Sequence, residues 1–244
     1  MRLHSQIEIR ADGAVGEILF ARPDRRNALS IAMQAEIIAC LADWAEDDSI
    51  RCVSMRGQGV FSSGLDRNEI LAAETREAAV ASSKALHRAV AHFRKPLIAG
   101  IAGYALATAF DIAVLCDLRV MASDAVLGKP ELSLGGAPLV MPLRWIVGDG
   151  HARDLALTGR RVGADEALRI GLVNHVVEPD QLAVATRALA DDIAAAPLDA
   201  LCMTKQFFID QPAPESWLPM EHDAVFDRNL GVRPQYSAGK KVRT

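Results

Sequence analysis

The sequence has few of the features that mark membrane, secreted or nucleic-acid-binding proteins. Aromatic residues make up 5% of its 244 residues, and its four cysteines form no CxxC pair and no metal-like spacing. Isolated cysteines among apolar neighbours are expected to be buried thiols. No run approaches the ~18 uninterrupted apolar residues of a membrane span, and the start has no apolar core of signal-peptide length.

The charge balance is slightly acidic. A net charge of −4 gives no general attraction to nucleic acid or to anionic membranes. We therefore expect a cytoplasmic protein with no nucleic-acid partner and no membrane association.

Apolar residues are plentiful, at 50% of the chain, and they recur in short segments that suit one large core. The patterns predict strands at 6–10, 14–20, 52–56, 97–101, 118–121 and 174–177, and helices after Ser30 and over 72–93, 108–116, 139–147, 151–157 and 164–170. This alternation predicts an α/β architecture with crossover connections. From Gln181 the pattern is helical only, so we expect a core over 1–180 and a helical region over 181–244 that packs on a neighbouring surface.

The stretch from Lys95 to Gly136 combines an apolar run with two carboxylates, Asp111 and Glu131. Burying a charge is costly, so a carboxylate in such surroundings needs a partner or a function. For Asp111 the ordinary alternative is a salt bridge with an arginine such as Arg119. For Glu131 it is a carboxylate in the first turn of a helix.

Several common catalytic motifs are absent. The loop over 57–66 has the glycine spacing of a P-loop, but Leu65-Asp66 stands where Lys-Ser/Thr is required. Neither Ser62 nor Ser63 has the flanking glycines of a nucleophile elbow. No HExxH pair is present and no GxGxxG follows a strand, so we expect no bound metal or dinucleotide.

Five segments together carry a resemblance. They are RPDRRNAL (22–29), GVFSSGLD (59–66), KPLIAGIAGYALATAFDIAVLCDLRV (95–120), GKPELSLGG (128–136) and LTGRRVGADEALRIGLVNHVV (157–177). In this order the chain resembles the crotonase, or enoyl-CoA hydratase/isomerase, superfamily. The resemblance implies a spiral of ββα units with a C-terminal helical region that supports homotrimers or hexamers. It also implies an acyl-CoA thioester substrate, with no cofactor beyond the CoA that the substrate carries.

The resemblance implies roles for individual residues. The backbone N–H groups of Ser63 and Thr108 would form an oxyanion hole for the thioester carbonyl, and preorganised donors of this kind stabilise enolate-like charge. Glu131 matches the family's catalytic glutamate, and Asp111 stands where hydratases carry a second glutamate. The family's glycine triplet is Ala107-Thr108-Ala109 here, so a glycine-type φ in it would be strained.

The remaining contacts with the substrate are expected from the same segments, with Tyr104 chiefly a packing residue beside the hole. They are Arg25, Arg26, Ala28, Gly64, Leu65, Asp66, Tyr104 and Pro130. The basic residues Lys240, Lys241 and Arg243 could assist at CoA or be merely solvated.

The function predicted from this resemblance is hydration of a trans-2-enoyl-CoA in fatty-acid metabolism, with Glu131 and Asp111 as acid and base. The first alternative is a Δ3-Δ2 enoyl-CoA isomerase that uses Glu131 as its single base. The second is a catalytically silent or RNA-associating homologue. The shorter side chain of Asp111 leaves the choice between hydratase and isomerase open.

Overall fold

The structure is a computed structural model that describes residues 6–210, 218–219 and 222. Its strands are β1 (Ile7–Asp12), β2 (Val15–Phe20), β3 (Cys52–Gly57), β4 (Leu97–Ile101), β5 (Tyr104–Leu106), β6 (Leu118–Ala122), β7 (Val126–Gly128), β8 (Arg161–Gly163) and β9 (His175–Val177). Its helices are α1 (Ile31–Glu46), α2 (Arg67–Leu71), α3 (Ala73–Ala91), α4 (Thr108–Leu115), α5 (Met141–Thr158), α6 (Ala164–Arg169), α7 (Leu182–Ala194) and α8 (Leu198–Asp210). Short 3-10 turns are η1 (Pro23–Arg25), η2 (Pro130–Leu134) and η3 (Pro179–Gln181).

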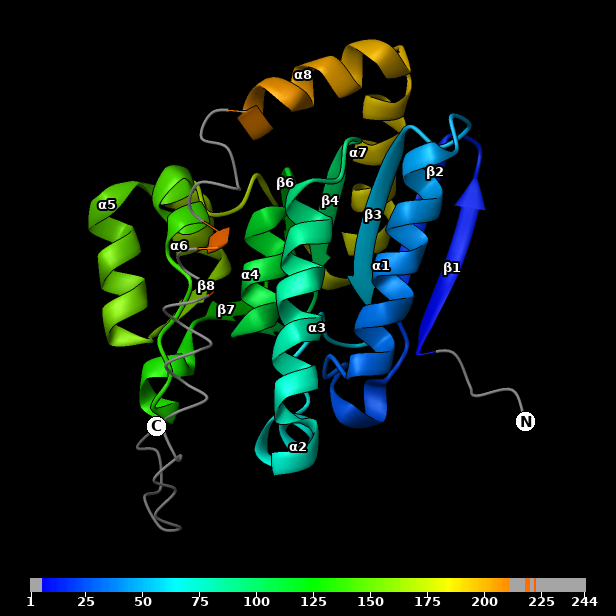
Figure 1. Ribbon diagram of the computed structural model, residues 1–244. Helices are drawn as coiled ribbons and strands as arrows, with labels where there is room; N and C mark the ends of the chain where they lie inside the picture. Colours follow the sequence, from blue (N-terminus) through cyan, green and yellow to red (C-terminus); the bar gives the residue numbers. More distant parts are fainter. Residues whose placement is uncertain (1–5, 211–217, 220–221, 223–244) are drawn as a thin grey trace.

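The main sheet has the order β1-β2-β3-β4-β6-β9. Strand β1 pairs antiparallel with β2 through the predicted hairpin, and the other neighbours are parallel. Parallel strands require crossover connections, and these are helical here. Figure 1 shows α1, α3 and α4 in front of this sheet and α7 behind it. The predicted α/β architecture is confirmed.

Local sequence signals explain several of these elements. Ser30 caps α1, and its side chain accepts a hydrogen bond from the Met33 amide. Strand β4 is buried at every position, as expected of a central parallel strand with both faces covered. The two helices predicted over 139–157 are joined as α5, but Gly148 has φ 72 and ψ 167, so the helix is broken there.

A second, three-stranded sheet was not predicted. It has the order β5-β7-β8, and each of its strands is three residues long. In it, β5 pairs with β7 in parallel and Leu106 lies opposite Gly128. This pairing brings the start of α4 beside the segment that begins at Lys129.

The first helix of the C-terminal region does not pack as predicted. Helix α7 lies on the main sheet of its own chain, against β2, β3, β4 and β6. Leu182, Thr186, Ala190 and Ala194 form its buried face. Small side chains on that face let the helix approach the sheet closely. The role of residues 181–244 in trimer formation stays a prediction, and most residues after Asp210 lie outside the described part.

Helix α8 is held to the core by one buried lysine. Lys205 Nζ donates to the Lys95 carbonyl at 2.8 Å and forms an ion pair with Asp117 at 2.8 Å. No helix in the described part of the chain is long and apolar enough to cross a membrane. Cys40, Cys52 and Cys116 are buried free thiols, as predicted, and burial raises the pKa of each to about 12. Cys202 is a free thiol but only half-buried, so the prediction of burial is wrong for it.

Candidate active site

The glycine-rich loop after β3 lies directly against β5. The Ser62 amide donates to the Tyr104 carbonyl at 3.1 Å, and the Leu106 amide donates to the Ser62 carbonyl at 3.2 Å. Gly64 has φ 93, and a Cβ at this position would lie 2.8 Å from the Leu106 oxygen. Only glycine permits this conformation and this contact together. The loop is therefore held beside the residues that lead into α4.

Some backbone amides of this loop donate a hydrogen bond within the fold, and others do not. The Ser63 N–H donates to the Arg26 carbonyl at 3.1 Å, and the Gly64 N–H donates to Ser62 Oγ at 3.1 Å. Within the described residues, the amides of Leu65 and Thr108 have no hydrogen-bond partner. A buried or half-buried N–H rarely stays unpaired unless water or a ligand satisfies it. The assignment of Ser63 is therefore corrected: Leu65, with Thr108, offers the free donors.

Backbone strain lies immediately before α4, as the missing glycines predicted. Ala107 has φ 52 and ψ −126, which side chains with a Cβ rarely adopt. Its amide donates to the Gly128 carbonyl at 3.0 Å, so the second sheet holds this conformation in place. The turn directs the Thr108 amide out of the start of α4, where the helix dipole favours negative charge.

Asp111 and Glu131 meet at a buried ammonium. Lys129 Nζ contacts Asp111 Oδ1 and lies 3.4 Å from Glu131 Oε1. The Lys129 side chain is fully buried, whereas 17% of the Glu131 side chain is exposed. Glu131 Oε2 is buried and accepts no hydrogen bond from the described residues. Asp111 is therefore salt-bridged, as the ordinary alternative held, but to Lys129.

Arg119, the alternative salt-bridge partner of Asp111, binds backbone carbonyls instead. Arg119 donates to the carbonyls of Leu172 and Cys116, both at 2.7 Å, and thereby connects the end of α4 to the segment before β9. Its guanidinium is buried on these backbone oxygens. Arg119 is therefore not the partner that the ordinary alternative named for Asp111, because the carbonyls at the end of α4 themselves needed donors.

Burial dominates the electrostatics of the cluster. It raises the pKa of Asp111 and of Glu131, and the positive charge of Lys129 opposes the rise in both. Burial lowers the pKa of Lys129, but the two carboxylates outweigh it and raise that pKa overall. His87 of α3 lies 3.9 Å from Asp111, and burial with the nearby Lys129 lowers the pKa of His87 to about 3. His87 is therefore neutral at ordinary pH.

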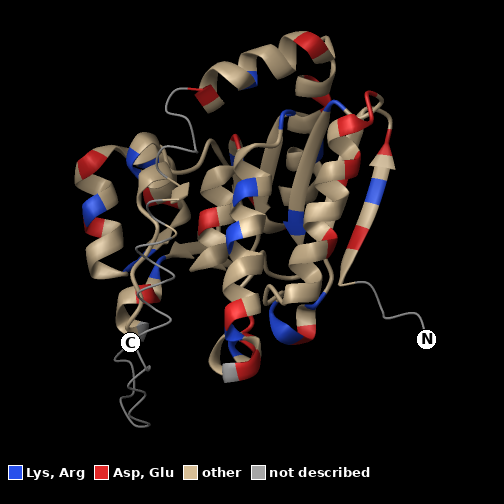
Figure 2. Ribbon diagram, in the orientation of Figure 1, with Lys and Arg blue, Asp and Glu red and all other residues tan. Residues whose placement is uncertain are grey.

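The basic turn before α1 is partly used for structure. Arg22 donates to the Ala28 carbonyl at 2.6 Å and pairs with Asp66 at 3.1 Å, and Asp66 also caps α2. Arg25 and Arg26 are exposed, at the basic segment below α1 in Figure 2. Arg25 lies 4.0 Å from the exposed carboxylate of Asp24, so a bound anion would compete only with a weak surface ion pair. Lys240, Lys241 and Arg243 lie outside the described residues.

Pro130 lies between Lys129 and Glu131 in the chain, whereas Tyr104 lies in β5 beside the glycine-rich loop. Tyr104 is half-buried in β5, and Pro130 is half-buried at the first position of η2, the turn that carries Glu131. Proline at the start of the turn fixes φ and so limits the freedom of Glu131. No group of side chains in the described chain has the composition of a metal site.

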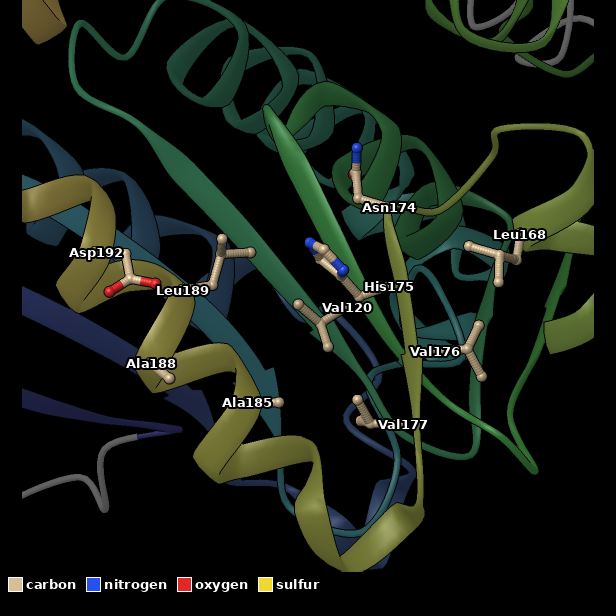
Figure 3. Close-up of a pocket in the computed structure, with 10 residues that line it drawn as sticks. All are labelled: Val120, Leu168, Asn174, His175, Val176, Val177, Ala185, Ala188, Leu189 and Asp192. Carbon is tan, nitrogen blue, oxygen red and sulfur yellow. The ribbon is translucent and has the colours of Figure 1, made fainter.

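A separate cavity of about 500 Å³ lies on the other side of the main sheet. Figure 3 shows it between β6 and β9 on one side and α7 on the other. Its lining is mostly apolar and includes His175 and Asp192. It shares no residue with the cluster around Glu131.

Comparison with known proteins identifies the family. Residues 10–219 match the model of the enoyl-CoA hydratase/isomerase family. A probable enoyl-CoA hydratase of Rhizobium meliloti (strain 1021) is 34% identical over 202 residues, which cover 81% of this chain and 79% of that protein. The chain belongs to the enoyl-CoA hydratase/isomerase family.

Other family members agree in sequence and in fold. The short-chain-enoyl-CoA hydratase of Clostridium acetobutylicum is 33% identical over 214 residues, covering 84% of this chain and 81% of that protein. The crystal structure of an enoyl-CoA hydratase/isomerase from Xanthobacter autotrophicus Py2 superimposes with a TM-score of 0.85 at 29% identity, over 97% of this chain and 90% of that one. The predicted crotonase-like fold is thereby confirmed.

The sequence alone did not single out Lys129 or His87 at the candidate site, and it gave Leu65 only as a substrate contact. Lys129 was visible only as an ordinary charge two positions before Glu131, and His87 as an isolated histidine on a helix. Leu65 was expected near the substrate but not as a donor. A lysine inside an otherwise apolar stretch that holds two carboxylates was the available signal for Lys129.

Proposed function

We propose that the protein adds water across the 2,3 double bond of a trans-2-enoyl-CoA. The convergence of Asp111 and Glu131 on one buried ammonium carries this proposal, since hydration needs two carboxylates in one site. The hydratase names of similar proteins support it.

In the proposed reaction the thioester oxygen accepts hydrogen bonds from the amides of Leu65 and Thr108. As the water oxygen bonds to C3, one carboxylate accepts the water proton and electron density moves to the thioester oxygen. That carboxyl group then delivers the accepted proton to C2 while the other carboxylate holds the water, and the carbonyl reforms. Burial of both groups suits this exchange, because it brings their pKa values closer to the working pH.

The central test is Glu131→Gln. Because general acid–base groups typically contribute ~10²–10⁴-fold, we expect hydration of crotonyl-CoA to fall by roughly that factor. Binding of butanoyl-CoA, measured by calorimetry, should persist, since the amide donors are untouched. Glu178→Gln is the matched control, as Glu178 pairs with exposed Ser123. Wild-type turnover in Glu131→Gln would refute the assignment, and a wild-type protein that neither binds nor converts thioesters would favour the silent homologue.

Isomerisation of a 3-enoyl-CoA to the 2-enoyl form is the second candidate. The contact between Lys129 and Asp111 favours it, because an aspartate tied to a buried ammonium is hindered from holding water. Glu131 alone could then move a proton from C2 to C4.

Asp111→Asn separates the two reactions. If the protein is a hydratase, hydration should fall by ~10²-fold or more, because one of two acid–base groups is lost. If it is a single-base isomerase, isomerisation should persist within about tenfold. Hydration and isomerisation assays on the same preparation give the answer, and equal loss of both would refute a single-base reaction.

A further inference from the structure

Lys129 occupies the centre of the candidate site. It follows β7 and precedes Pro130, so both sides of its backbone are fixed. Its side chain is fully buried, contacts Asp111, lies 3.4 Å from Glu131 and stands 5.1 Å from the centre of the Phe110 ring. Burying a lysine so completely is costly unless its charge has partners, and here both carboxylates are its partners.

Two carboxylates this close cannot ordinarily both be ionised. In a shared buried site their repulsion raises the pKa of one of them, and the pair keeps one proton between them. With a positive charge between them, both carboxylates can be ionised without a shared proton. Lys129 supplies this charge, and the carboxylates in turn keep its ammonium protonated.

Two histidines of other parts of the chain lie against or just beyond the cluster. His87 packs against Asp111 from α3 and is neutral, because its pKa is lowered to about 3. His222 lies beyond it, with 3.1 Å between His87 Nδ1 and His222 Nε2. In the described part of the chain, the charge of Glu131 is therefore controlled by Asp111 and Lys129.

We propose that Lys129 is a positioning residue that takes the place of the proton otherwise shared by Asp111 and Glu131, so that Glu131 rests as an ionised base. This inference rests on the proposed role of Glu131 as the group that moves a proton at C2. It holds for hydration and for isomerisation alike, since either reaction passes through proton transfer at that carbon.

Proton exchange at C2 of butanoyl-CoA in deuterated water isolates this step, because a saturated thioester can be neither hydrated nor isomerised. Glu131 takes the C2 proton while the electron pair of the C2–H bond moves toward the thioester oxygen. The bound proton is replaced by a solvent deuteron, which returns to C2. Mass spectrometry of the thioester measures the rate, and repeating it across pH gives the acid limb that reports ionisation of Glu131.

Lys129→Met removes the positive charge at similar length. Without it the pKa of Glu131 rises further, so we expect the acid limb to move up by about one pH unit or more. Exchange should then fall about tenfold at about pH 6 and by less than about threefold at about pH 9. Lys129→Arg should restore most of the wild-type profile.

Asp111→Asn should move the acid limb in the opposite direction. The negative charge of Asp111 raises the pKa of Glu131, so its loss leaves Lys129 unopposed. The double variant Lys129→Met/Asp111→Asn should lie between the two single variants. It also removes the Asp111 charge that Lys129→Met alone would leave buried and unpaired, so it tests the proposal even where Lys129→Met folds poorly.

Lys205→Met is the matched control, since Lys205 is a buried lysine paired with an aspartate away from the site. It should leave the acid limb in place. The role of Lys129 would be overturned if the acid limb of the exchange profile stayed within about 0.3 pH unit of wild type in both Lys129→Met and the double variant. In that case Glu131-dependent turnover of crotonyl-CoA would still uphold the proposed function. A protein without any Glu131-dependent reaction would overturn the proposed function first, and the role of Lys129 with it.

Discussion

Ala107 holds a backbone conformation that its own side chain opposes. A positive φ in a residue with a Cβ typically costs ~1–3 kcal/mol, and the surrounding hydrogen bonds must outweigh it. Ala107→Gly removes this cost but loosens the unfolded chain by ~0.4–1 kcal/mol. We therefore expect a net gain of about 1 kcal/mol in the free energy of unfolding, measured by urea denaturation.

Ala109 provides the contrast for this experiment. It lies two residues further along, inside α4 with ordinary helical geometry, and is fully buried. Ala109→Gly should lose about 1 kcal/mol, because glycine is a poor helix former. Destabilisation by both variants would show that the conformation of Ala107 carries no strain.

At the scale of single residues, the sequence indicated candidate site residues but not the contacts between them. Glu131 and Asp111 stood out as carboxylates in an apolar stretch, and their catalytic roles stay predictions. The lost glycines predicted the strain before α4 that Ala107 shows. Lys129 reaches both carboxylates because Leu106 pairs with Gly128. Strands of three residues are too short for this pairing to be predicted from sequence. The use of the Ser63 amide by Arg26 likewise depends on how two distant loops pack.

Among the connecting elements, the loop from β3 to α2 has the least room for change. Gly64→Ala combines an unfavourable φ with a contact of 2.8 Å to backbone, so the loop must shift. We expect a loss of roughly 2–3 kcal/mol in stability and a marked fall in kcat, because the Leu65 amide moves with the loop. Thermal unfolding and crotonyl-CoA turnover measure the two effects.

Gly59→Ala separates conformational strain from the clash. Gly59 has φ 75, similar to that of Gly64, but a Cβ there would meet nothing within 4 Å. Gly59→Ala should lower the free energy of unfolding by about 1–2 kcal/mol and leave kcat near the wild-type value. Equal loss of kcat in both variants would mean that the position of Leu65 is unimportant.

Most long elements were predictable, as were the short β9 and α6, but the three strands of the second sheet were not. Strands β1 to β4 and helices α1, α3 and α4 have strong periodicity or clear end signals, such as Ser30 before α1. The three strands of the second sheet are too short for periodicity, so their pairing is set by tertiary contacts. The packing of α7 on the sheet was missed because a face of alanines is only weakly apolar.

On the scale of the whole molecule, α8 leaves large apolar side chains uncovered. Met203, Phe207 and Phe208 are 59%, 69% and 77% exposed, and Figure 1 shows α8 standing at one end of the molecule. An exposed group of this kind often marks an interface. We propose that α8 contributes to the contact between copies of the chain in the expected trimer or hexamer.

Phe207→Ser/Phe208→Ser tests this assembly. The double variant should lower the molar mass in solution toward that of one chain, measured by light scattering after size-exclusion chromatography, with thermal stability of the isolated chain little changed. Val184→Ser, at a 65% exposed position on α7, is the control and should leave the molar mass unchanged. An unchanged assembly in the double variant would place the interface elsewhere.

The two edge strands of the main sheet, β1 and β9, are poorly suited to pairing with another copy of the chain. Strand β1 carries Glu8, Arg10 and Asp12 in alternation, and β9 has only three residues. Charged or very short edge strands resist pairing with the strands of another molecule. Within the described part of the chain, neither edge is therefore suited to aggregation by endless sheet extension. A folded copy is thus protected from fibre-like stacking through its sheet edges.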